Sequence, residues 1–234
     1  SKINLKVKIK LIKRALISVY NKEGITDFAK ELVELGIEII STGGTYKLLK
    51  ENEIEVKSVE EVTGFPEILN GRVKTLHPNI FAGILADRDN PAHTEELIKH
   101  KSDHKIETID LVIVNLYPFE ETISKKGITV AEAIEQIDIG GVSLIRAAAK
   151  NFKDVNVIVD PKQYEEYLKL LHSTKNKIPF EYSQKLAEKA FKNTSDYDNN
   201  IQKYFGKLNQ IEHINSGEKT EEILKAEFPK AENT

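Results

Sequence analysis

Five short apolar runs, separated by segments with helical periodicity, restrict the fold of this chain more than any other feature. The runs cover residues 15–19, 37–40, 56–59, 111–114 and 155–159, and each is as short as a buried strand. Between the first two runs, Ile25, Phe28 and Leu32 lie on one face of a predicted helix, which Gly36 is placed to end. This alternation predicts an α/β fold in which a mainly parallel central sheet carries helices on both faces.

Further helices are predicted over residues 130–137 and 142–149, with one or two more within 179–205. Residues 2–11 alternate polar and apolar side chains, which favours an added edge strand over an amphipathic helix. A chain of 234 residues that is 40% hydrophobic can bury one substantial core. We therefore expect an N-terminal extension (1–13), one main domain (14–205) and a polar C-terminal tail (206–234).

Composition excludes several classes of function. The net charge of −3 balances 34 basic against 37 acidic residues, so no global field indicates a nucleic-acid or membrane partner. The absence of cysteine excludes disulfides, thiolate metal sites and cysteine nucleophiles. No apolar run approaches the ~20 residues that span a bilayer, and no cluster of histidine and carboxylate residues has metal-site spacing. We expect a cytoplasmic protein that needs no cofactor and no metal.

Residues 41–45 (Ser-Thr-Gly-Gly-Thr) connect a predicted strand to a predicted helix. Gly43 and Gly44 allow successive backbone N–H groups to point into one concavity at a helix N-terminus, and the hydroxyls of Thr42 and Thr45 add donors. This pattern predicts a phosphate site. A tight turn with Thr45 as an ordinary N-cap explains the residues equally well. The segment lacks the Walker A and GxGxxG patterns, so neither a nucleoside triphosphate nor a dinucleotide is indicated.

A second polar segment, residues 70–78, carries two cations and a hydroxyl. If the backbone is extended, Arg72 and Lys74 project on one side next to Thr75 and could meet a phosphate. A solvated basic pair is the alternative. His77 precedes a proline and is predicted to make a structural hydrogen bond.

Two further groups lie near the predicted carboxyl ends of strands or the start of a helix. Asn115 and Tyr117 end the fourth strand, where ligands bind in open α/β sheets, and could recognise a heterocycle. A packed loop anchored by Phe119 is the alternative. Asp138 precedes an alanine-rich helix that ends with Lys150, and a desolvated lysine beside an aspartate can exchange protons near neutral pH. A surface salt bridge is the alternative.

Together these segments resemble one family, the IMP cyclohydrolase domain that forms the N-terminal part of a bifunctional purine enzyme. The most specific stretches are residues 70–78 and 135–151. The others that match are residues 15–19 with Lys22 and Gly24, and residues 41–45, 63–67, 82–85 and 115–119.

The resemblance implies a methylglyoxal-synthase-like α/β/α sandwich. It also implies ring closure of 5-formamidoimidazole-4-carboxamide ribotide (FAICAR) to IMP with loss of water, with FAICAR and IMP as ligands and a homodimer as the expected assembly. Carried over position by position, the phosphate site comprises Lys22, Thr42, Gly43, Gly44, Thr45, Arg72, Lys74 and Thr75. The base-facing and catalytic groups are Asn115, Tyr117, Asp138, Gly140 and Lys150, and Lys74 is also assigned a catalytic role.

The motif resemblance ends after Phe205, so we expect no formyl transfer from a folate. A single-activity cyclohydrolase and an excised domain both remain open. Methylglyoxal synthase, a rival with the same fold, uses an aspartate after paired glycines, whereas Thr45 and Val142 follow the paired glycines here. A nucleotide-sensing module, the other rival, would need the phosphate loop but not Lys74, Tyr117 and the Asp138/Lys150 pair together.

Overall fold

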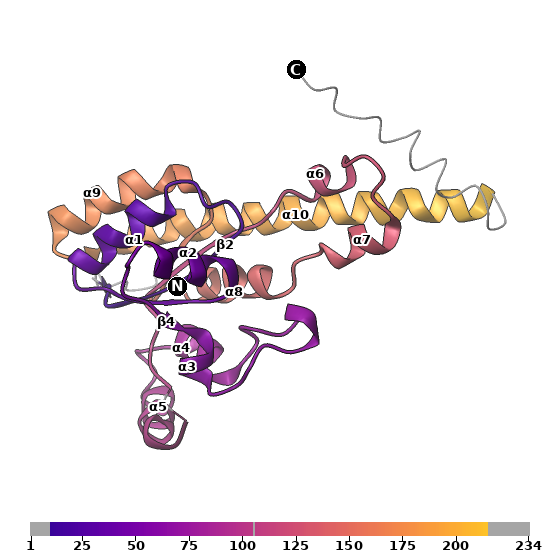
Figure 1. Cartoon of the computed structure of the whole chain (residues 1–234). Helices are drawn as coiled ribbons and strands as arrows, with labels where there is room; N and C mark the ends of the chain where they lie inside the picture. Colours follow the sequence, from indigo (N-terminus) through magenta and orange to yellow (C-terminus); the bar gives the residue numbers. More distant parts are fainter. Residues whose placement is uncertain (1–9, 105, 215–234) are drawn as a thin grey trace, which may run out of the picture. The chain divides into compact units, whose positions relative to one another are not determined.

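The computed structural model describes residues 10–104 and 106–214 and has an α/β architecture (Figure 1). Within these residues, five strands form a parallel sheet in the order β4-β3-β2-β5-β6. Their bounds are β2 (Arg14–Val19), β3 (Glu38–Ser41), β4 (Lys57–Ser58), β5 (Leu111–Asn115) and β6 (Asn156–Ile158). Each strand overlaps one of the predicted apolar runs, so the predicted parallel sheet is confirmed.

Helices cover both faces of this sheet. On one face α1 (Ile25–Glu34) contacts α2 (Gly43–Glu51) and α9 (Tyr164–Thr174). On the other, α4 (Pro78–Leu85) contacts α3 (Val59–Thr63) and α8 (Gly140–Lys150). From β2 the strand order runs through β3 to β4 in one direction along the sheet, and β5 and β6 follow on the other side of β2 in the opposite direction. Because parallel crossovers are right-handed, connections that run in opposite directions place their helices on opposite faces of the sheet. This is the predicted three-layer sandwich.

The described end of the N-terminal extension is not part of the main sheet. Strand β1 (Lys10–Leu11) pairs antiparallel with β7 (Lys177–Ile178) in a separate two-stranded sheet. The N–H of Ile12 also donates to Asn176 O at 2.9 Å, which holds the chain on this second sheet. Residues 10 and 11 of the expected edge strand thus form a strand that pairs with β7 and not with the five-stranded sheet. Residues 1–9 lie outside the described residues.

The chain forms two compact units. The first contains residues 10–116 and 139–192, and so includes the parallel sheet, η1 (Leu69–Gly71), α5 (Pro91–His104) and η2 (Pro161–Gln163). The second contains α6 (Phe119–Ile123), α7 (Val130–Glu135) and the later part of α10 (Phe180–Ile214), where the rings of Phe119 and Tyr204 meet edge-on. Helix α10 continues past residue 206 to Ile214, and the rest of the expected C-terminal tail, residues 215–234, lies outside the described residues.

Candidate active site

The first component of the site is the N-terminus of α2. Strand β3 ends at Ser41, Thr42 is the extended N-cap, and the helix begins at Gly43, which has a φ of 57°. The side chain of Thr42 makes no capping hydrogen bond. Backbone N–H groups in the first turn have no intrahelical partners, and the helix dipole favours a negative charge there. The start of α2 therefore has the donors and the field of an anion site.

Thr45 and Lys22 are linked to each other behind this helix end. Thr45 is 3% exposed, and its hydroxyl accepts from the N–H of Val19 and donates to the Val19 carbonyl, both at 3.1 Å. The ammonium of Lys22 donates to the Thr45 hydroxyl at 3.2 Å and to the Val19 carbonyl. Thr45 is thus not the N-cap, and its hydroxyl serves to position Lys22. Partial burial lowers the pKa of Lys22.

Lys74 and Thr75 complete a cluster around the starts of two helices. The Lys74 ammonium lies 3.4 Å from the point that a Cβ on Gly43 would occupy, and 3.3 Å from Glu67 Oε2. The Thr75 hydroxyl lies 3.2 Å from the corresponding point on Gly140, the first residue of α8. The first unit thereby gathers the beginnings of α2 and α8 around one cation and one hydroxyl. Because Gly43 and Gly140 have no side chains, Lys74 and Thr75 can lie close to the backbone at the starts of the two helices.

Arg72 and His77 flank that segment. The backbone at Arg72 is not extended, because the residue follows the η1 turn with φ −64° and ψ −26°, so the condition under which it would project beside Lys74 is not met. Its side chain is exposed. Nδ1 of His77 accepts from the N–H of Asn79 at 3.1 Å and caps α4, so the predicted structural role of His77 is confirmed.

Asn115 fixes the loop that carries Lys22. Its Oδ1 accepts from the N–H of Asn21 at 2.8 Å, and its Nδ2 donates to the carbonyl of the same residue at 3.0 Å. The side chain is buried at the end of β5. The two hydrogen bonds of Asn115 therefore hold the loop next to Lys22 in place.

Lys150 lies far from this cluster within one chain. It is the last residue of α8, and Gly140 is the first, so a helix about 15 Å long separates their backbones. The next residue, Asn151, bonds to the carbonyls of Ile84 and Ala86. Lys150 is exposed, so the single chain does not show the desolvated lysine beside an aspartate that the sequence analysis described. Spacing along the sequence did not reveal that α8 runs back toward the amino ends of the strands.

Tyr117 and Asp138 belong to the second unit. The Lys125 ammonium lies 4.8 Å from the centroid of the Tyr117 ring, a cation–π arrangement. The backbone N–H of Asp138 donates to the hydroxyl of Tyr197 on α10 at 2.8 Å. Burial raises the pKa of Tyr197, so its hydroxyl remains neutral. The sequence did not predict the hydrogen bond between Asp138 and Tyr197, since the helical spacing of Tyr197 indicates only that it lies on a helix.

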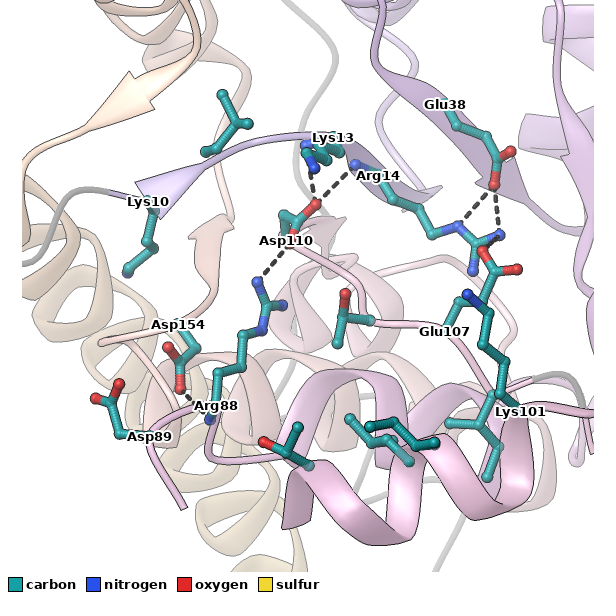
Figure 2. Close-up of a pocket in the computed structure, with 16 residues that line it drawn as sticks. Lys10, Lys13, Arg14, Glu38, Arg88, Asp89, Lys101, Glu107, Asp110 and Asp154 are labelled. Carbon is teal, nitrogen blue, oxygen red and sulfur yellow. Dashed lines mark hydrogen bonds and ion pairs between the residues drawn. The ribbon is translucent and has the colours of Figure 1, made fainter. Parts of the chain in front are cut away.

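A separate cavity of about 690 Å³ lies at the amino ends of the strands (Figure 2). Arg14 pairs with Glu38 at 2.6 Å and with Glu107 at 2.7 Å. Asp110 accepts from Arg88 at 2.6 Å and from two backbone N–H groups. These charges satisfy one another, so we interpret the cavity wall as a structural ion-pair network.

The described part of the chain contains neither a candidate metal-binding cluster nor a helix that could cross a membrane. No three histidine, aspartate or glutamate side chains there are grouped so that they could hold a metal ion. No described helix is both long and apolar enough to cross a membrane.

Comparison with protein families gives two matches. Residues 24–143 match the MGS-like domain, and residues 148–233 match the AICARFT/IMPCHase bienzyme. The second match extends past residue 205, so the prediction that the resemblance ends there is wrong. That boundary depended on short motifs, which the polar C-terminal segment lacks.

Individual relatives give the same result. The chain is 57% identical over 205 residues to the bifunctional purine biosynthesis protein PurH of Thermoanaerobacter sp. (strain X514), covering 86% of the chain and 39% of that protein. PurH of Bacillus subtilis (strain 168) is 53% identical over 193 residues, with 82% and 37% covered. The crystal structure of ForH superposes with a TM-score of 0.73 at 35% identity, covering 83% of the chain and 97% of ForH. The chain thus spans roughly two fifths of the length of these PurH relatives.

Proposed function

Since the chain belongs to the MGS-like domain family, we propose that it is an IMP cyclohydrolase, which closes FAICAR to IMP with loss of water. The observation that carries this proposal is the meeting of Lys74 and Thr75 with the glycines that begin α2 and α8. Such an arrangement suits a ribonucleotide whose phosphate needs backbone donors and a cation. The similarity to PurH proteins, whose name states a role in purine biosynthesis, supports the choice of substrate.

The phosphate would bind the uncapped start of α2, with Lys22 behind the helix end and Lys74 beside Gly43. Thr75 and Gly140 would then lie on the side of the phosphate that leads to the ribose and the base. Arg72 would contribute long-range attraction from an exposed position. In this scheme Thr45 and Asn115 act through Lys22, because their side chains hold its loop.

Ring closure is intramolecular, so much of the rate enhancement comes from holding the two substituents in one plane with the phosphate as anchor. The carboxamide nitrogen attacks the formyl carbon and loses one proton, and the formamido nitrogen loses the other. Both protons leave with the former formyl oxygen as water. We assign proton removal from the amide to the Asp138/Lys150 pair, and hydrogen-bond donation to the formyl oxygen to Tyr117 and Lys74.

Lys150 requires a second copy of the chain in this scheme. The family resemblance gives it a catalytic role, yet α8 carries it about 15 Å from Gly140 of its own chain. We propose that the protein acts as a homodimer in which each Lys150 serves the site of its partner. An exposed lysine at a helix end is available for such a contact.

An absorbance assay of IMP formation from FAICAR tests the function, with methylglyoxal production from dihydroxyacetone phosphate measured in parallel. We expect IMP formation, inhibition by sulfate or inorganic phosphate, and unchanged turnover in EDTA. Production of methylglyoxal without IMP would replace the proposal with the rival activity. IMP binding without turnover, in a preparation shown to be dimeric, would favour the nucleotide-sensing rival.

A further inference from the structure

Residues 67–74 form a tight hairpin next to the candidate phosphate site. Ile68 and Val73 form an antiparallel bridge, with N–H···O bonds of 3.1 and 3.4 Å. Glu67 precedes this bridge and Lys74 follows it, and their side chains form an ion pair at 3.3 Å. The N–H of Glu67 is held in turn by the carboxylate of Glu60 at 3.3 Å. The hairpin therefore fixes the backbone on both sides of the ion pair.

The tip of the hairpin has an uncommon backbone. Leu69, Asn70 and Gly71 all have positive φ, at 55°, 54° and 86°. The left-handed region is unfavourable for a residue such as leucine. A Cβ on Gly71 would lie 2.8 Å from Lys74 Cε and 2.9 Å from Glu67 Oε1, so the ion pair packs directly on this glycine. The tight turn thus leaves room for the pair and holds it in place.

The ion pair meets the anion site through Lys74, whose ammonium lies beside Gly43. We infer that Glu67 is a positioning residue, which holds the Lys74 ammonium at the start of α2 for the bound ribonucleotide. The expected effect of Glu67 on turnover rests on the proposed function. Glu67 does not need to touch the substrate, because an ammonium has three donors and the carboxylate uses one of them.

The position of Glu67 has opposite effects on binding and on turnover. Its negative charge opposes an incoming phosphate, whereas its tether keeps the Lys74 donor aligned with the reacting oxygen. The pair is about one third exposed, so its charge acts modestly on binding. Alignment of a donor affects the transition state more strongly than the ground state. Removing the charge should therefore improve phosphate binding and reduce turnover.

The test is the variant Glu67→Gln, with Glu165→Gln as a matched control. Glu165 pairs with Lys169 on the exposed face of α9, so this control removes the same charge from another ion pair of the first unit. We expect Glu67→Gln to lower kcat for FAICAR roughly tenfold and to tighten inorganic phosphate binding about threefold. Glu67→Asp keeps the charge on a shorter side chain, so it should bind phosphate like the wild type and recover only part of kcat.

The combination of the two readouts distinguishes positioning from a structural role. Parallel loss of kcat, phosphate affinity and melting temperature would mean that Glu67 only supports the hairpin, and unchanged kcat and affinity would mean that it has no role at the site. Either result overturns the inference. If the wild-type chain forms no IMP, the proposed function fails separately. Phosphate affinity and the NMR signal of the Lys74 ε-methylene in the ligand-free variant then still decide whether Glu67 positions Lys74.

Discussion

The ammonium of Lys22 lies 3.2 Å from the hydroxyl of Thr45, which belongs to the first turn of α2, the helix whose start forms the candidate phosphate site. Asn115 holds the loop that carries this lysine through two bonds to Asn21. The lysine is thus positioned before any ligand arrives, and its charge is partly removed from water. This arrangement makes the charge of Lys22 and the hydroxyl of Thr45 separately testable.

Phosphate binding should be coupled to proton uptake at Lys22. Burial lowers the folded-state pKa below the ordinary 10.5, so between these two values the folded protein binds fewer protons than the unfolded chain and its stability increases with pH. A bound anion favours the charged lysine, so binding in that pH window should take up protons. Calorimetry of inorganic phosphate binding in two buffers of different ionisation enthalpy measures this uptake. Lys22→Arg, which remains charged, should abolish it, and equal uptake in this variant would assign the protons to another group.

Thr45→Val should affect stability more than catalysis. The substitution preserves the shape but leaves the buried N–H of Val19 without its acceptor, which costs roughly 1–3 kcal/mol. Urea unfolding measures the loss. Thr42→Val is the matched control, because the side chain of Thr42 makes no capping bond and its loss should change stability little. Equal destabilisation by the two substitutions would contradict the inward role of Thr45.

Alanine substitutions at the two glycines of α2 should have opposite effects. Gly43 has a positive φ and lies against the Lys74 ammonium, so Gly43→Ala should cost about 1–2 kcal/mol and weaken phosphate binding. Gly44 lacks a positive φ and has open space around it, so Gly44→Ala should stabilise the protein by roughly 0.5 kcal/mol. Thermal unfolding with and without phosphate measures both effects. Equal phosphate affinity in the two variants would show that Gly43 is not part of the anion site.

Asp138→Ala and Lys150→Ala should each lower kcat by roughly 10²–10⁴, the range for lost acid–base catalysis. If Lys150 serves the partner's site, mixing the two inactive variants should restore activity, because half of the sites in a mixed dimer contain both wild-type residues. Subunit exchange followed by the FAICAR assay measures this recovery. A mixture without activity, despite exchange shown by sedimentation of tagged chains, would exclude the shared site. Full turnover by Lys150→Ala alone would remove this lysine from the mechanism.

Asp110→Ala should destabilise the fold without altering the chemistry at the other edge of the sheet. Asp110 is 4% exposed and accepts from Arg88 and from the N–H groups of Lys13 and Arg14. Removal of one partner from a buried pair costs roughly 3 kcal/mol. The exposed pair Lys47–Glu51 is the control, and Glu51→Ala should change stability by less than about 0.5 kcal/mol. Urea unfolding compares the two, and similar losses would show that the network adds nothing beyond a surface ion pair.

The sequence by itself determined the layers of the fold and the segments that form the site. Apolar runs of strand length and the helical spacing of Ile25, Phe28 and Leu32 are local signals, since burial imposes the period of each element on its own residues. The glycines at positions 43 and 44 likewise predicted a strand-to-helix turn that could bind an anion. Such features depend on neighbours along the chain, so one sequence is enough to predict them.

Only the tertiary structure decided which polar side chains have partners inside the protein. The inward hydroxyl of Thr45, the tether between Glu67 and Lys74, and the distance of Lys150 from Gly140 all depend on where separate elements meet or how a helix runs across the sheet. A hydroxyl or an ammonium suits a ligand and an internal partner equally well by its chemistry. Long-range packing selects between them, and the periodicity of one segment carries no information about the residues packed against it.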